Sequence, residues 1–91
     1  MRIHDAFISQ RIANKIWEEH GVSADEAIEL LYSNPMIRRA RDGRYMAVGL
    51  SPSGYLTVIF EYHHGVAEIV TAYSSSDWQV KLFKKSQRKG R

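Results

Sequence analysis

The chain contains no cysteine, only two prolines, and no apolar run of membrane-spanning length. The absence of cysteine excludes disulfides, thiolate metal sites and a cysteine nucleophile. Because a small secreted domain usually depends on such cross-links, we expect a cytoplasmic protein. The first residues also lack the apolar segment of a signal peptide, so no membrane association is expected.

The remaining composition is typical of one small folded domain. The 91 residues are 44% hydrophobic and 25% charged, which fits a globular chain with a single core. We predict one domain over residues 1–86, followed by a basic, flexible tail over residues 87–91.

Basic residues are distributed unevenly along the chain. Residues 1–80 hold seven basic and ten acidic residues, a net charge of −3, whereas residues 81–91 hold six basic residues and no acid. A concentrated positive segment favours a phosphate backbone or an acidic partner. The alternative for the last few residues is a solvated tail without a partner.

Two helices are predicted between about residues 10 and 33. The first begins after Ser9 and ends at Gly21, which suits the left-handed position behind a helix. The second begins with a capping box over Ser23–Glu26 and ends at Asn34-Pro35. Their apolar stripes, at helical spacing, are Ile12, Ala13, Ile16 and Trp17 in the first and Ala27, Leu30 and Leu31 in the second. Before them, Ile3 and Phe7 alternate with polar residues and indicate a short edge strand.

Four antiparallel strands are predicted after these helices. A short strand starts at Met36, and Asp42-Gly43 is a two-residue turn signal that joins it to a strand over 44–50. Two longer strands follow over 55–62 and 66–73, separated by turns rich in glycine and serine. On the middle strand the drier face consists of Leu56, Val58, Phe60 and Tyr62. We therefore expect a sheet with one covered face and one more exposed face.

A last helix is predicted from a second capping-box pattern, Ser76–Gln79. Trp78, Leu82 and Phe83 would dock this helix, and its other side carries Lys81, Lys84 and Lys85. The order of elements predicts an α+β fold with two N-terminal helices, a four-stranded, mostly antiparallel sheet with an extra N-terminal edge strand, and a C-terminal helix.

Three blocks of the sequence form a further pattern. The first runs from Lys15 to Ala27 and contains His20-Gly21-Val22-Ser23; the second runs from Arg44 to Phe60, and the third is Ile69–Tyr73. In order and spacing these blocks resemble the BrnT-type toxins of type II toxin–antitoxin systems. The resemblance implies a RelE-like fold and a ribonuclease that inhibits translation. It also implies a cognate antitoxin as partner, in a hetero-oligomer that represses its own operon, with a homodimer as an alternative assembly.

The chain departs from the family at the end of the last strand. Where the family has Ser/Thr-Ala-Arg, this sequence has Thr71-Ala72-Tyr73. The departure keeps a second function open, namely a non-catalytic RelE-like module that binds an antitoxin or nucleic acid.

RNA cleavage of this kind requires a group that activates the ribose 2′-hydroxyl, cations that stabilise the transition state, and an acid for the leaving oxygen. The predicted catalytic residues are Tyr73, Lys81, Lys84 and Arg44. The predicted RNA-binding residues are Arg38, Arg39, Arg41, Lys85 and Tyr55. No metal and no cofactor are predicted.

Each candidate also has a purely structural interpretation. The arginines can equally mark a solvated hairpin edge that prevents strand pairing. Strand tyrosines are more often sheet residues with their hydroxyls at the rim. His20 is better explained as a residue that ends the first helix than as a catalytic base.

Overall fold

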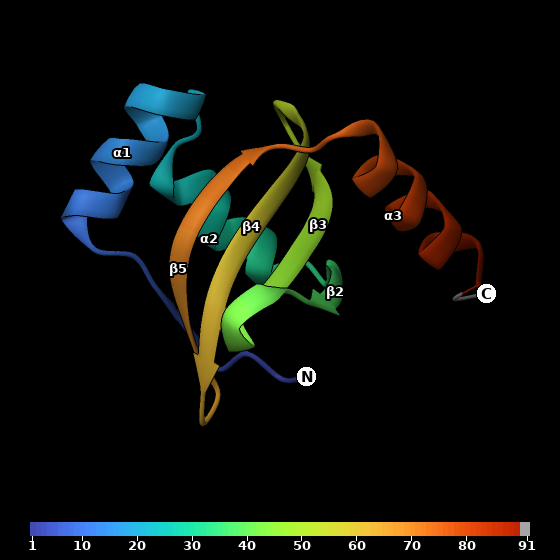
Figure 1. Cartoon of the computed structure of the whole chain (residues 1–91), viewed down its shortest axis with the longest axis horizontal. Helices are drawn as coiled ribbons and strands as arrows, with labels where there is room; N and C mark the ends of the chain where they lie inside the picture. The colour runs from blue at the N-terminus through green and yellow to red at the C-terminus, as the bar shows by residue number, and fades with distance from the viewer. Residues whose placement is uncertain (90–91) are drawn as a thin grey trace.

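A five-stranded mixed sheet organises the chain in the computed structural model, which describes residues 1–89 (Figure 1). The elements in chain order are β1 (Asp5–Phe7), α1 (Gln10–His20), α2 (Ala24–Tyr32), β2 (Met36–Arg39), β3 (Tyr45–Ser51), β4 (Gly54–His63), β5 (Val66–Ser74) and α3 (Asp77–Lys89). The strand order is β1-β5-β4-β3-β2, with β1 parallel to β5 and the other neighbours antiparallel. The predicted α+β fold is confirmed, including the extra N-terminal edge strand.

Two further predictions from the sequence concern the C-terminal tail and the possibility of a membrane-spanning helix. The boundary of the basic tail at residue 87 stays a prediction, and residues 90 and 91 lie outside the described residues. Over residues 1–89, no helix has both the length and the apolar character needed to cross a membrane.

The first two helices begin and end where local chemistry predicts. The Ser9 hydroxyl accepts a hydrogen bond from the Ile12 N–H at 3.2 Å, and the Ser23 hydroxyl accepts one from the Glu26 N–H at 3.1 Å. The Ser23 hydroxyl also donates to the Glu26 carboxylate at 3.3 Å, so the two side chains of the predicted capping box are in contact. Gly21 ends α1 with φ of 66°, in the left-handed region.

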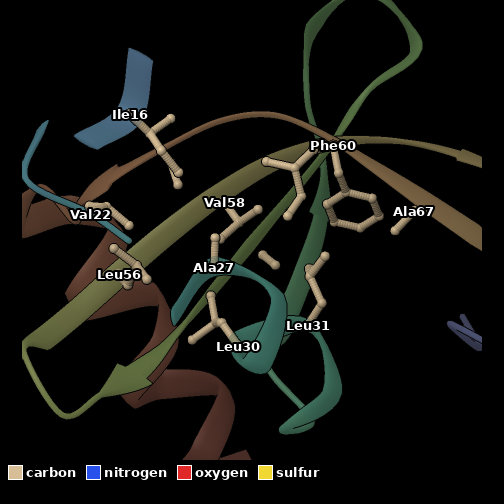
Figure 2. Packing of buried hydrophobic residues seen from close by; sticks show 12 residues of the cluster. Ile16, Val22, Ala27, Leu30, Leu31, Leu56, Val58, Phe60 and Ala67 are labelled. Atoms are coloured by element: carbon tan, nitrogen blue, oxygen red, sulfur yellow. The ribbon is translucent and has the colours of Figure 1, made fainter. Parts of the chain in front are cut away.

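The main core lies between α1, α2 and one face of the sheet (Figure 2). Val58 and Phe60 of β4 are completely buried there, together with Ile16 of α1. Gly49 lets α2 lie close to β3, because a β-carbon at this position would stand 2.7 Å from the Leu30 side chain. The predicted place of Trp17 in this core is wrong, since its side chain is 63% exposed. The stripe by which α1 packs on the sheet is narrower than predicted, and Trp17 lies beside it.

A β-bulge in β5 decides which side chains reach each face of the sheet. Ile59 of β4 pairs with Thr71, whereas Phe60 pairs with Ile69, so Val70 is an extra residue. One extra residue reverses the alternation of side chains along the strand. Ile69 therefore faces the main core before the bulge, and after it Tyr73 points to the opposite face.

The opposite face is covered in part by α3. Met36, Met46 and Val48 form a small apolar cluster there, with Leu82 and Phe83 of α3 packed against it. The expectation that only one face would be covered is thus incomplete. The prediction that Trp78 docks α3 on the sheet is wrong, because Trp78 is 57% exposed. Gln79, which is 3% exposed, lies at the centre of the contact between α3 and the sheet. Gln79 precedes Leu82 and Phe83 by three and four residues and therefore lies on their side of the helix, whereas Trp78 lies at the edge of this stripe.

The hairpin between β2 and β3 pairs as predicted but turns differently. The Ala40 N–H donates to the Arg44 carbonyl at 2.9 Å, and a 3₁₀ turn over Arg41–Gly43 closes the loop. The loop therefore has three residues in place of the predicted two. Asp42 and Gly43 both adopt left-handed backbone angles, with φ of 58° and 72°, which explains why this dipeptide occurs here.

Candidate active site

A groove of about 660 Å³ lies between the β2–β3 hairpin and the start of α3. Its floor is the second face of the sheet, where Met46 and Ile59 contribute side chains. Its walls include five residues that the sequence predicts as functional: Tyr73, Arg38, Arg39, Arg41 and Arg44. The fold thus gathers residues from β2, the hairpin loop, β3 and β5 around one hollow.

Tyr73 is held in this groove by a buried glutamine. The Gln79 amide donates to the Tyr73 hydroxyl at 3.2 Å and to the Met46 sulfur at 3.4 Å. The Gln79 carbonyl accepts hydrogen bonds from the Thr57 hydroxyl at 3.0 Å and from the Ser76 N–H at 2.9 Å. The second of these is the reciprocal bond of the predicted capping box. Because an amide nitrogen only donates, Tyr73 keeps its own O–H for another acceptor.

His20 approaches Tyr73 from the open edge of β5. β1 pairs only with residues 66–68 of β5, so the far end of the strand is accessible to the end of α1. The His20 and Tyr73 ring centroids are 6.0 Å apart with the rings inclined at 55°. The His20 side chain is 36% exposed, and its Nε2 lies 3.9 Å from a Glu19 carboxylate oxygen. The histidine at the helix end therefore also stands beside the candidate site.

The arginines of the groove are solvated to different degrees. Arg38, Arg39 and Arg41 are exposed, whereas Arg44 is half-buried and its Nε lies 3.5 Å from a Glu61 carboxylate oxygen. An ion pair at this distance and exposure is weak, so Arg44 remains available to a phosphate. Guanidinium groups bind phosphate oxygens in pairs, which makes this cluster suited to an RNA backbone.

The remaining predicted residues lie elsewhere on α3 and β4. The Lys84 Nζ lies 5.7 Å from the centre of the Tyr55 ring, and Phe83 meets the same ring edge-on at 5.9 Å. These side chains line a separate hollow of about 410 Å³. Lys81 and Lys85 are exposed residues of α3, and neither lines the groove of Tyr73. The structure therefore divides the predicted residues between the groove and the lysine-bearing side of α3.

Two side chains that sequence reasoning left out of the site are Gln79 and His20. His20 carries a signal, because it lies in the first of the three blocks that resemble the BrnT family. Gln79 carries only the capping-box signal, and its bond to Tyr73 depends on a contact between α3 and β5 that no local pattern encodes.

This architecture is shared with a protein of known structure. No family model and no curated protein matches the chain. Among solved structures, the ribonuclease toxin BrnT of Brucella abortus matches with a TM-score of 0.67. The match has 20% sequence identity and covers 80% of this chain and 97% of that chain. The chain has a BrnT-like fold. The likeness extends over almost the whole of that chain, which is described as a ribonuclease toxin.

Proposed function

We propose that this chain is the toxin of a type II toxin–antitoxin system, acting in the cytoplasm as a metal-independent endoribonuclease that inhibits translation. The observation that carries the proposal is the groove in which a buried glutamine holds the Tyr73 hydroxyl among four arginines. The BrnT-like fold supports it, since a solved structure with this fold is described as a ribonuclease toxin. The proposed partners are RNA as substrate and a cognate antitoxin protein in a hetero-oligomer.

In the proposed reaction the ribose 2′-oxygen attacks the adjacent phosphorus and the bond from phosphorus to the 5′-oxygen breaks. The His20 imidazole, whose ring centre lies 6.0 Å from that of Tyr73, accepts the proton of the 2′-hydroxyl. The Tyr73 O–H donates a proton toward the departing 5′-oxygen, and the arginines stabilise the extra negative charge on the phosphorane. The products are a 2′,3′-cyclic phosphate and a 5′-hydroxyl, and exchange with water restores both protonation states.

The lysines have a different part in this proposal. Lys81 and Lys84 lie outside the groove, so we assign them, with Lys85, to phosphates of the RNA backbone beyond the one that is cleaved. Tyr55 is assigned to a neighbouring base, because its ring lines the hollow on the same side of α3 as Lys84.

The test is cleavage of a fluorescently labelled single-stranded RNA by the purified protein, free of antitoxin, in the presence of EDTA. We expect fragments with 2′,3′-cyclic phosphate ends. Replacing Arg38, Arg39, Arg41 and Arg44 by glutamine together lowers the rate at least 100-fold, because the charge that stabilises the transition state is lost. Intact RNA after prolonged incubation with the folded wild-type protein contradicts the proposal.

One observation favours the second function, a non-catalytic module that binds an antitoxin or nucleic acid. The family arginine is replaced by Tyr73, whose hydroxyl is engaged by Gln79. The variant Tyr73→Arg separates the two functions in the same RNA assay. Cleavage by Tyr73→Arg but not by the wild type identifies the natural chain as a binder, whereas cleavage by the wild type identifies it as an enzyme.

A further inference from the structure

β2 lies at one end of the sheet, and within the described residues its outer edge pairs with no strand (Figure 1). The Ala40 N–H donates toward β3, to the Arg44 carbonyl. Backbone groups of successive residues in an antiparallel strand alternate between the two sides. Arg38 therefore also bonds toward β3, and Ile37 and Arg39 direct their N–H and C=O groups outward. These two residues are a template for one more strand.

A hollow of about 570 Å³ runs beside this edge. Leu31 and Tyr32 from the end of α2 line it together with Ile37, and they give it an apolar part. Its other prominent lining is basic: Arg2, Arg38 and Arg39 border it, and none of its described lining residues is acidic. The edge of the sheet is thus accompanied by a pocket for an apolar side chain and by three positive charges.

We propose that β2 receives an extended acidic segment of a partner protein as a sixth strand of the sheet. Main-chain hydrogen bonds to Ile37 and Arg39 would hold the segment, as in other cases of strand addition. Its carboxylates on one face would meet Arg38, and an apolar residue at an alternate position, on the opposite face, would enter the hollow beside Ile37. The inference goes beyond the proposed function, because strand addition requires no RNA cleavage.

Charge decides between this occupant and a second copy of the chain. Two copies joined through β2 would bring Arg38 and Arg39 of each copy onto the same short pair of strands, and facing like charges destabilise such a pair. An acidic segment would instead bring negative charges to this strand and would be attracted to it. Arg38 also lines the groove of Tyr73, so a bound acidic strand competes with RNA for this guanidinium group.

The experiment uses the full chain and a fluorescein-labelled ten-residue peptide of alternating glutamate and valine, with binding followed by anisotropy. One control peptide alternates lysine and valine. A second keeps the glutamates but has proline in place of valine, so that it carries the same charge while every second residue lacks an N–H and has a fixed φ that disfavours an extended strand. We expect at least tenfold tighter binding of the glutamate–valine peptide than of either control.

Two protein variants separate backbone pairing from charge. Arg39→Gln removes the charge, and Arg39→Pro removes the charge together with an outward N–H that β3 does not use. We expect Arg39→Pro to bind the glutamate–valine peptide about tenfold more weakly than Arg39→Gln, as the loss of one hydrogen bond at an interface predicts. Thermal melting by circular dichroism checks that both variants fold. In the wild type, the peptide should protect the Ile37 and Arg39 amides from hydrogen exchange, a readout that requires no variant.

Several outcomes would overturn the proposal. Equal affinity for the glutamate–valine and glutamate–proline peptides would mean that the arginines attract acids without strand pairing. The absence of strand pairing would also follow from equal affinity of Arg39→Pro and Arg39→Gln for the peptide. It would follow as well from Ile37 and Arg39 amides that stay unprotected in the saturated complex. Binding of a short RNA but of neither acidic peptide would assign the arginines to RNA alone. A dimer that sedimentation shows to be lost in Arg39→Pro would assign the edge to a second copy.

Discussion

The sheet face that α1 and α2 cover is closed by apolar side chains, whereas the face under α3 is closed around a glutamine and a threonine. Phe60, Val58 and Ile16 fill the first face without a polar partner. On the second face Gln79 and Thr57 are both buried and bonded to each other. Apolar packing is strong but carries no direction, while hydrogen bonds fix the position of the groups they join. The difference explains why the candidate site lies on the second face, with the first as its support.

The largest effect is expected from removing a side chain of the apolar face. Phe60→Ala leaves a cavity at a completely buried position, and we expect a loss of about 3–5 kcal/mol in the free energy of unfolding. The matched change on the second face is Met46→Ala, where the apolar cluster is smaller and the expected loss is about 2 kcal/mol. Urea unfolding followed by circular dichroism measures both. An equal loss in the two variants would contradict the unequal division of stability between the faces.

An intermediate effect on stability, with a larger one on activity, is expected at Gln79. Gln79→Met keeps the length of the side chain but leaves the Ser76 N–H without its acceptor and the Thr57 hydroxyl with Ser75 as its remaining partner. We expect a loss of about 1–3 kcal/mol in unfolding free energy. If the proposed function holds, RNA cleavage falls about 10–100-fold, because Tyr73 loses the group that orients it.

The control for this variant is Gln87→Met, on an exposed position of the same helix. It should leave the free energy of unfolding close to that of the wild type. A Gln79→Met protein that is as stable as Gln87→Met and as active as the wild type would show that the polar network has no orienting role.

The parts of the fold that the sequence predicted are those encoded by neighbouring residues. Ser9 and Ser23 cap helices through hydrogen bonds three residues away, so the pattern alone is sufficient. The long strands follow from β-branched and aromatic residues between turn residues. Trp17 and Trp78 misled the prediction, because a large aromatic side chain suggests burial, whereas a domain of this size leaves the flanks of α1 and α3 exposed.

The arrangement of the candidate site depends on features that no local pattern reveals. Without the bulge at Val70, Tyr73 would share the face of Ile69 and point into the apolar core. Neither glycine nor proline marks this bulge, so the alternation of residues along β5 gives no sign of it. The grouping of the arginines with Tyr73 depends on how α3 crosses the second face. The arginine hairpin beside Tyr73 was predicted, whereas the separation of the α3 lysines from this groove was not.

The smallest effect on the free energy of unfolding is expected at Glu26. This residue belongs to a group of polar side chains at the rim of the apolar face. The Ser53 hydroxyl, which donates to Glu26 at 2.6 Å, lowers the pKa of this carboxyl from its usual value of 4.5; partial burial acts in the opposite direction, and Ser23 and Ser51 add to the lowering. A carboxyl with a lowered pKa in the folded state contributes stability that is fully present above pH 4.5 and is lost as the pH falls through the folded-state pKa. Glu26→Gln removes this contribution, so its stability deficit relative to the wild type should be constant near pH 7 and should shrink below pH 4.5.

Urea unfolding at a series of pH values measures this deficit, and Glu29→Gln removes the same charge from an exposed position of α2 as the control. The sign of the pH dependence distinguishes a stabilising carboxylate from a destabilising one. A deficit that grew as the pH fell would mean that the carboxylate is destabilising in the folded state and that the hydroxyls do not compensate for its burial. A deficit that shrinks would mean that the link from α2 to the β3–β4 turn is a charged hydrogen bond added at the edge of a core that apolar packing alone holds together.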